Sequence, residues 1–170
     1  HISAHGAQVI FEPLYFYNYL QDQEIPWLAE SYQYNKDFTE LTIKIRPDTA
    51  WSDGQPFTAR DVAYTLNMLR DNAPELRYAT EIQKWVKKAD AVDELTAKVY
   101  LTSPNPRFFF NYLTSHQDIC LWILPEHIWK DEDPKSFSNY DMAKGWPVVT
   151  GPYKLAISTK DQTIFDLRPD

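Results

Sequence analysis

Apolar and polar residues alternate between residues 40 and 46, which is the period of a half-buried β-strand. The apolar members are Leu41, Ile43 and Ile45. The turn-forming residues 35–37 separate this stretch from residues 28–34, which are rich in aromatic and small side chains. The pattern predicts a β-hairpin over residues 28–46.

A second hairpin is predicted over residues 81–101. Residues 81–92 form its first arm, Asp93 and Glu94 its turn, and residues 96–101 its second arm. The second arm has the clearer alternation, with apolar residues at Ala97, Val99 and Leu101.

One long helix is predicted between the two hairpins. The turn Trp51-Ser52-Asp53-Gly54-Gln55-Pro56 precedes it, and Thr58 stands three residues before Asp61, as in a capping box. A stripe of apolar residues then recurs at helical spacing and indicates the buried face of a helix over residues 59–70, and Pro74 follows its end. The members of this stripe are Val62, Ala63, Leu66 and Leu69.

The second half of the chain predicts shorter elements. Asn105 and Pro106 indicate the start of a helix over residues 107–113, and Pro125 the start of another through residue 129. We interpret the apolar run 119–124 as a strand, and residues 153–158 and 163–167 as two more strands. The fold class predicted is α+β, with hairpins packed against short helices.

Charge and composition exclude several classes of protein. The net charge of −7 is spread along the chain, which argues against a nucleic-acid partner. The longest apolar run has six residues, so no transmembrane segment is predicted. With only 4 glycines, a glycine-rich phosphate loop is disfavoured. The start of the chain has neither the basic nor the apolar part of a signal peptide.

The side chains that could do chemistry each have a simpler structural role. Asp53 lies in the predicted turn, Asp61 in the helix cap and Glu126 in the first turn of a short helix. The lone Cys120 sits in an apolar run and is expected to be buried. His1 and His5 are the one histidine pair at helical spacing, at the chain end. We therefore predict no enzyme, no cofactor and no metal site.

Aromatic side chains gather between residues 15 and 19. On a strand, Tyr15, Tyr17 and Tyr19 would share one side, and Phe16 and Asn18 the other. Tyrosine rings with hydroxyl groups suit contact with peptides or sugars, but packing within the core or between domains would use the same rings. A polar island, residues 115–118, is either an exposed loop or part of a site, with His116 as its candidate.

Three segments together resemble a known family. They are residues 28–32 (LAESY), 51–62 (WSDGQPFTARDV) and 150–155 (TGPYKL), in this order and spacing. The chain is similar in them to the family 5 extracellular solute-binding proteins, the dipeptide, oligopeptide and nickel receptors of ABC importers. The resemblance implies two lobes that close on a ligand by hinge bending. It implies an α+β domain at residues 12–147 inserted into the first lobe, with residues 1–11 and 148–170 as parts of that lobe and the second lobe outside the chain.

The resemblance also implies a function and a set of candidate residues. The chain would be a fragment of an extracytoplasmic receptor, periplasmic or lipid-anchored, that binds peptides or oligopeptides and delivers them to a membrane permease. An oligosaccharide receptor of the same family and a protein-interaction module remain alternatives. Three regions match family segments that border the ligand, and Tyr17 is added from the aromatic patch. The candidate ligand-binding residues are His5, Gly6, Tyr17, Arg77, Tyr78, His116 and Gln117.

Overall fold

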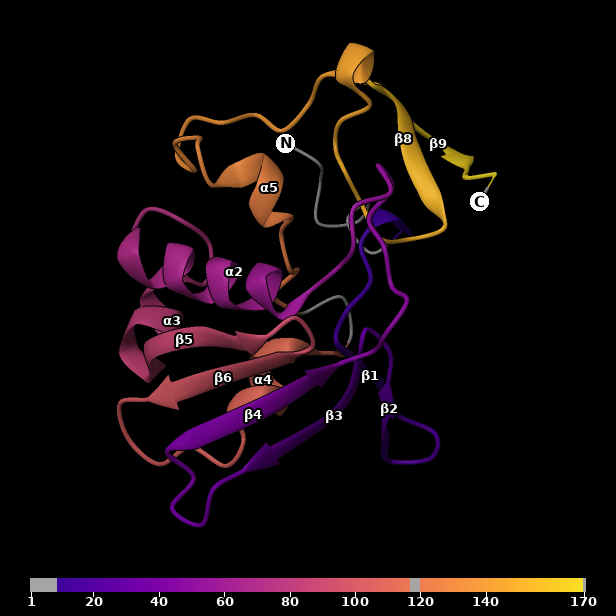
Figure 1. Ribbon diagram of the computed structural model, residues 1–170. Coiled ribbons are helices and arrows are strands. Elements are labelled where there is room, and N and C mark those ends of the chain that lie inside the picture. Colours follow the sequence, from indigo (N-terminus) through magenta and orange to yellow (C-terminus); the bar gives the residue numbers. More distant parts are fainter. Residues whose placement is uncertain (1–8, 117–119, 170) are drawn as a thin grey trace.

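The larger sheet of the protein has four antiparallel strands. A computed structural model describes residues 9–116 and 120–169 (Figure 1). The strand order is β3 (Ala29–Tyr34), β4 (Glu40–Ile45), β6 (Thr96–Leu101) and β5 (Val86–Asp93). Both predicted hairpins are therefore present, and pairing of β4 with β6 joins them into one sheet.

The two faces of this sheet differ in the way that the alternation predicts. Leu41, Ile43 and Ile45 are buried on one face, where α2 (Ala59–Asp71), α3 (Ala79–Trp85) and α4 (Phe108–Leu113) lie. The other face carries cross-strand polar pairs that remain accessible. Among them, Lys98 forms an ion pair of 2.7 Å with Glu40. One face of the sheet therefore forms the core, and the other is polar.

A smaller sheet packs beside the first. Its order is β2 (Gln23–Pro26), β1 (Tyr15–Asn18) and the short β7 (Thr114–Ser115), which runs parallel to β1. The ring of Tyr15 is buried and meets Tyr32 and Phe109 edge-on, with centroids 5.4 and 5.0 Å away. Tyr15 and Tyr17 lie on one side of β1 as predicted, but the strand ends at Asn18 and Tyr19 lies in the turn that follows.

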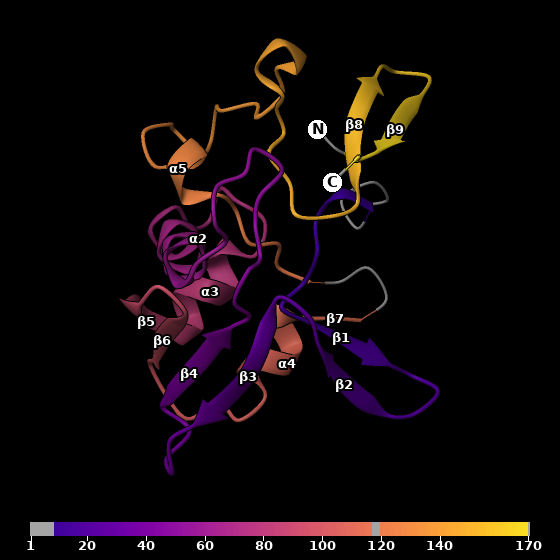
Figure 2. The ribbon, with the colours of Figure 1, turned by 45° about the vertical axis from the view of Figure 1, so that its right-hand side comes forward.

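The last part of the chain forms a separate hairpin. Strands β8 (Tyr153–Ser158) and β9 (Thr163–Leu167) have the predicted bounds and pair with each other. They project from the same side of the molecule as β1 and β2 (Figure 2). Along the chain, α5 (Glu126–Trp129) and the 3-10 turn Met142–Lys144 come between β7 and this hairpin.

Two predicted elements differ from the structure. Residues 81–85 belong to helix α3, and β5 begins only at Val86. The helical part of this stretch has Ala79 and Ile82 as its buried residues, three apart, which is a helical spacing and not that of a strand. The run 119–124 was predicted as a strand, but residues 120–124 form no strand and Ile119 lies outside the described residues. The backbone amide of Leu121 donates to the carbonyl of Tyr112, and that of Leu124 to the hydroxyl of Thr65, so these bonds go to helices and not to a sheet.

Candidate functional site

Asp61 holds the start of helix α2, which forms one wall of the groove described below. Its side chain is only 3% exposed, and its Oδ2 accepts hydrogen bonds from the Thr58 amide at 2.8 Å and the Trp51 indole at 3.3 Å. Its Oδ1 accepts from the Glu126 amide at 2.8 Å, which ties α5 to the start of α2. Burial raises the pKa of the Asp61 carboxyl, and the hydrogen bonds oppose that rise. The predicted capping box is therefore present and serves as scaffold.

Arg77 and Tyr78 form a prebuilt pair at the corner between α2 and α3. The guanidinium carbon of Arg77 lies 4.8 Å from the centroid of the Tyr78 ring, and its Nη2 donates to the Tyr78 hydroxyl at 3.1 Å. Tyr78 precedes α3 with a φ of 66°, a left-handed conformation that is uncommon for a residue with a large side chain. Arg77 is exposed and Tyr78 is half-buried.

Tyr17 and His116 belong to a second group, which we call the aromatic patch: Tyr17, Tyr19, Arg107, Phe110 and His116. The ring of Phe110 is 5.2 Å from Tyr17 and 5.2 Å from His116, and the guanidinium of Arg107 lies 4.6 Å from it. The Tyr17 hydroxyl donates to Asp22, and this bond raises the pKa of the tyrosine. Helix α4 thus brings Tyr17 and His116 together, although they are distant in sequence. The contact runs through Phe110, which the sequence analysis did not single out.

The structure does not bring all candidates together. In the part of the chain that the structure describes, no hydrogen bond or ring contact joins the pair Arg77–Tyr78 to the aromatic patch. His5, Gly6 and Gln117 lie outside the described residues.

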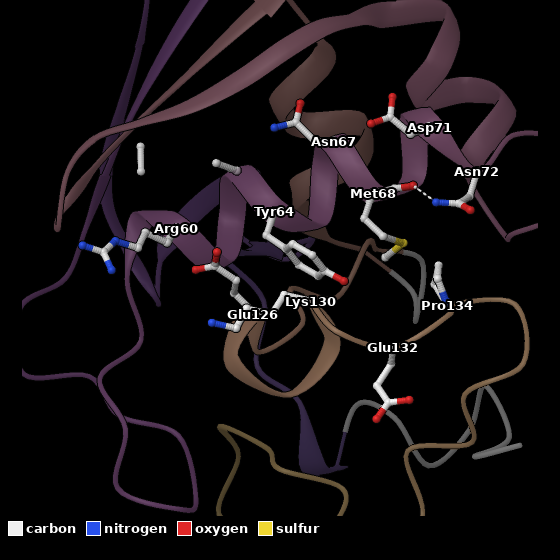
Figure 3. A pocket seen from close by; sticks show the side chains of 12 residues that line it. Arg60, Tyr64, Asn67, Met68, Asp71, Asn72, Glu126, Lys130, Glu132 and Pro134 are labelled. Atoms are coloured by element: carbon white, nitrogen blue, oxygen red, sulfur yellow. Dashed lines mark hydrogen bonds between the residues drawn. The ribbon is translucent and has the colours of Figure 1, made fainter.

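A groove that the sequence analysis missed runs between α2 and residues 126–134. Its volume is about 510 Å³, and Figure 3 shows Tyr64 and Met68 in its middle, with charged side chains around them. The charged residues Arg60, Glu126, Lys130 and Glu132 come from the polar side of α2, from α5 and from the loop after it. From the sequence, the polar face of α2 could be predicted as one wall of this groove. The other wall, residues 126–134, is too distant in sequence for its contact with α2 to be predicted.

The acidic residues and the cysteine have structural surroundings. Asp53 lies 2.7 Å from the Nε2 of His127, and its other carboxylate oxygen accepts from the Gln55 amide. Cys120 is buried, which raises the pKa of its thiol to about 12 and makes a thiolate nucleophile unfavourable.

Over residues 9–116 and 120–169, no cluster of three or more His, Cys, Asp or Glu side chains could hold a metal ion. Over the same ranges, no helix has both the length and the apolar character needed to cross a bilayer.

Comparison with known proteins identifies relatives over nearly the whole chain. The profile of the family described as bacterial extracellular solute-binding proteins, family 5 Middle, matches residues 23–170. The probable peptide-binding protein YejA of Agrobacterium fabrum is 30% identical over 148 residues, covering 84% of this chain and 22% of that protein. The glutathione-binding protein GsiB of Pectobacterium atrosepticum is 30% identical over 129 residues, covering 75% of this chain and 22% of the relative.

Solved structures show the same fold. The periplasmic oligopeptide-binding protein of an oligopeptide ABC transporter from Thermotoga maritima superposes with a TM-score of 0.76 at 27% identity, covering 95% of this chain and 28% of that one. A mannohexaose-bound structure from the same transporter has a TM-score of 0.73 at 26% identity, with the same coverage. The chain thus spans less than a third of the length of the relatives it matches.

Proposed function

Because this chain belongs to the bacterial extracellular solute-binding proteins of family 5, we propose that it forms part of a receptor that captures peptides outside the cytoplasm for an ABC importer. The observation that carries this proposal is the superposition of 95% of the chain on an oligopeptide-binding protein at 27% identity. A membrane permease is the partner that such a receptor requires. The relatives described above are named as binding proteins, and the proposal includes no reaction.

The proposed domain arrangement gives this chain one inserted domain and two pieces of the first lobe. Residues 12–147 would be the insertion, with residues 1–11 and 148–170 on either side of it. Two hydrogen bonds support this boundary: the Gly151 amide donates to the Ile10 carbonyl at 2.8 Å, and the Glu12 amide donates to the Thr150 side-chain hydroxyl at 3.0 Å. An inserted domain leaves and re-enters its host at neighbouring points, which is the geometry of these contacts.

The ligand would contact Arg77 and Tyr78 together with Tyr17 and His116. His5, Gly6 and Gln117 remain part of this proposal from the resemblance. The aromatic rings would supply contact area at low entropic cost. The Arg77 guanidinium would offer carbonyl or carboxylate oxygens the N–H donors that its bond to the Tyr78 hydroxyl leaves free. An extended peptide offers such oxygens at every residue.

An oligosaccharide is the second candidate ligand. It is favoured by the mannohexaose-bound Thermotoga maritima structure, at 26% identity, and by the half-exposed rings of the aromatic patch, on which sugars could stack. The receptor as a whole would again serve uptake, with the same localisation outside the cytoplasm, in the periplasm or tethered by a lipid.

Isothermal titration of the full-length parent protein tests both candidates. A library of di- to pentapeptides and a set of manno-oligosaccharides would be titrated under the same conditions. We expect saturable binding of at least one peptide class and none of the sugars. Binding of sugars alone would replace the peptide assignment with the second candidate, and hydrolysis of any of these compounds would contradict the assignment as a receptor.

A further inference from the structure

Glu24 on β2 accepts hydrogen bonds from two elements that are distant from it in sequence or in the sheet. Its Oε1 accepts from the Thr114 hydroxyl at 2.7 Å, and its Oε2 accepts from the Tyr32 hydroxyl at 2.7 Å. Thr114 is fully buried and Glu24 is half-buried. Within residues 9–116 and 120–169, the carboxylate of Glu24 forms no ion pair. It therefore serves as an acceptor for one hydroxyl group from β7 and one from β3.

The register of the smaller sheet lets the first of these bonds cross a strand. Glu24 lies opposite Tyr17 in the antiparallel pair β1–β2, and Thr114 lies opposite Tyr15 in the parallel pair β1–β7. Opposed residues point to the same face of a sheet, as do Tyr15 and Tyr17, which are two apart on β1. The side chains of Glu24 and Thr114 thus share one face, and their bond ties the two outer strands together over β1.

Strand β7 depends on such a tie because it is short. It has two residues, which pair with Tyr15 and Phe16 of β1, and it follows α4 directly (Figure 2). His116 comes next, and its Nδ1 lies 2.9 Å from the carbonyl oxygen of Thr114. Since a carbonyl oxygen only accepts, Nδ1 donates, and the neutral ring offers Nε2 as an acceptor. The position of Thr114 therefore also sets the orientation of the His116 imidazole.

The second bond connects Glu24 to the helix that carries the aromatic patch. The Tyr32 ring stacks on the buried ring of Phe109, with centroids 3.9 Å apart. Phe109 is followed by Phe110, the ring at the centre of the aromatic patch. The pKa of Tyr32 is raised, first by burial and then by its bond to Glu24, so the hydroxyl keeps the proton that it donates. Holding Tyr32 in place thus also holds α4.

We propose that Glu24 is a positioning residue for the aromatic patch. Its carboxylate holds β7 and β3, and this fixes where Tyr17 and His116 lie relative to each other. In this role Glu24 contacts no ligand and acts through the side chains that it holds. The consequence for binding rests on the proposed function, in which Tyr17 and His116 contact the ligand, whereas the positioning itself does not.

NMR spectroscopy of the isotope-labelled 170-residue chain tests the positioning. Overhauser effects between the rings of Phe110, Tyr17 and His116 report their arrangement, and amide exchange of residues 114–116 reports how firmly β7 is held. We expect Glu24→Leu, which accepts no hydrogen bond, to weaken these Overhauser effects and to increase the exchange about tenfold. Glu24→Gln keeps one acceptor oxygen and should give intermediate values.

Glu40→Leu is the matched control. Glu40 is also a half-buried glutamate on a strand, and it forms an ion pair of 2.7 Å with Lys98 on the accessible face of the larger sheet. Its replacement should change neither the Overhauser effects of the aromatic patch nor the exchange of residues 114–116. Equal changes in Glu40→Leu and Glu24→Leu would reflect a general loosening of the fold and would overturn the inference.

Two further variants each remove one of the bonds with little change in shape. Thr114→Val should reproduce the faster exchange of β7, and Tyr32→Phe should weaken mainly the ring contacts of Phe110. They also decide the test if Glu24→Leu does not fold. Unchanged Overhauser effects and unchanged exchange in the folded variants would overturn the positioning role.

The consequence for binding is measured on the parent protein, by calorimetry with the tightest-binding peptide of the library described above. Glu24→Leu should raise its Kd about three- to tenfold, and Glu40→Leu should leave it unchanged. An unchanged Kd in Glu24→Leu would overturn the role of this residue in binding. If no peptide binds to the wild-type parent, the proposed function fails, while the positioning measured by NMR stands.

Discussion

Asp61 shows how one buried side chain can join three parts of this chain. It caps α2, holds the indole of Trp51 and accepts the first amide of α5. Both carboxylate oxygens receive N–H donors, so the role needs an acceptor at each oxygen position. The sequence motif identifies the cap, but only the structure adds α5, which is 65 residues away.

We expect Asp61→Asn to destabilise the protein by about 2–3 kcal/mol, because the amide NH₂ would face an N–H donor and leave it unsatisfied. Urea denaturation would measure this loss. Asp71→Asn, on the same helix but in an exposed ion pair, should lower stability by less than about 1 kcal/mol. Equal losses of stability in the two variants would contradict the proposed contribution of the buried Asp61 hydrogen bonds.

The difference in stability between the wild type and Asp61→Asn should depend on pH in a direction that the pKa of Asp61 sets. The pKa of Asp61 is raised in the folded state, so the folded protein takes up its proton at a higher pH than the unfolded chain. The wild type should therefore gain stability relative to Asp61→Asn as pH falls from 7 toward the ordinary carboxyl range near 4, and lose it as pH rises again. Urea titrations of both proteins at several pH values would measure it, and a difference that shrinks toward acid would contradict the raised pKa.

Tyr78 combines an unfavourable backbone with a proposed ligand contact. Its φ of 66° costs a residue with a side chain about 1–2 kcal/mol, but glycine almost nothing. We expect Tyr78→Gly to be more stable to urea than Tyr78→Ala by about 1 kcal/mol. In the parent protein both variants should lose ligand affinity, since both lack the ring. If Tyr78→Gly kept full affinity, the ring would have no part in binding.

At the scale of elements, local patterns determined most of the fold. Strands β4 and β6 follow period-two alternation, and α2 follows its cap and its apolar stripe. The errors arose where local signals are ambiguous. Residues 81–85 continue into β5 without a turn residue, and the apolar run before Pro125 fills space between helices. Short apolar segments do not distinguish a strand from other buried backbone.

Gly151 joins two elements that are distant in sequence. A Cβ at this position would lie 2.8 Å from the carbonyl oxygen of Ile10 and 2.9 Å from its carbonyl carbon, and both are backbone atoms that cannot move aside easily. We expect Gly151→Ala to destabilise the protein by about 1–3 kcal/mol. Thermal unfolding would measure this. Gly145→Asn is the control, because its surroundings are open and asparagine tolerates its φ of 73°; a similar loss in both variants would remove the argument from close approach.

At the scale of the whole molecule, the chain carries only part of a binding protein. It spans 28% of the length of the oligopeptide-binding protein on which it superposes, and the candidate contacts Arg77, Tyr78, Tyr17 and His116 are exposed or half-buried. Ligand sites normally enclose most of the ligand's surface. A receptor that clamps its ligand needs its second wall.

We therefore expect the 170-residue chain to bind the parent's ligand far more weakly than the parent does. Calorimetry with the same ligand on both proteins is the measurement. Sub-micromolar affinity of the isolated chain would contradict the two-walled site and place the whole binding surface on these residues.

The sequence by itself determined most of the elements and the family, because strand alternation, helix caps and the motif at residues 51–62 are local patterns of neighbouring residues. Tertiary structure alone decided which candidates meet. Phe110 joins Tyr17 to His116, Asp61 holds the first amide of α5, and residues 126–134 close a groove over α2. These contacts join segments tens of residues apart, and local patterns of a few residues do not reveal which distant surfaces pack against each other.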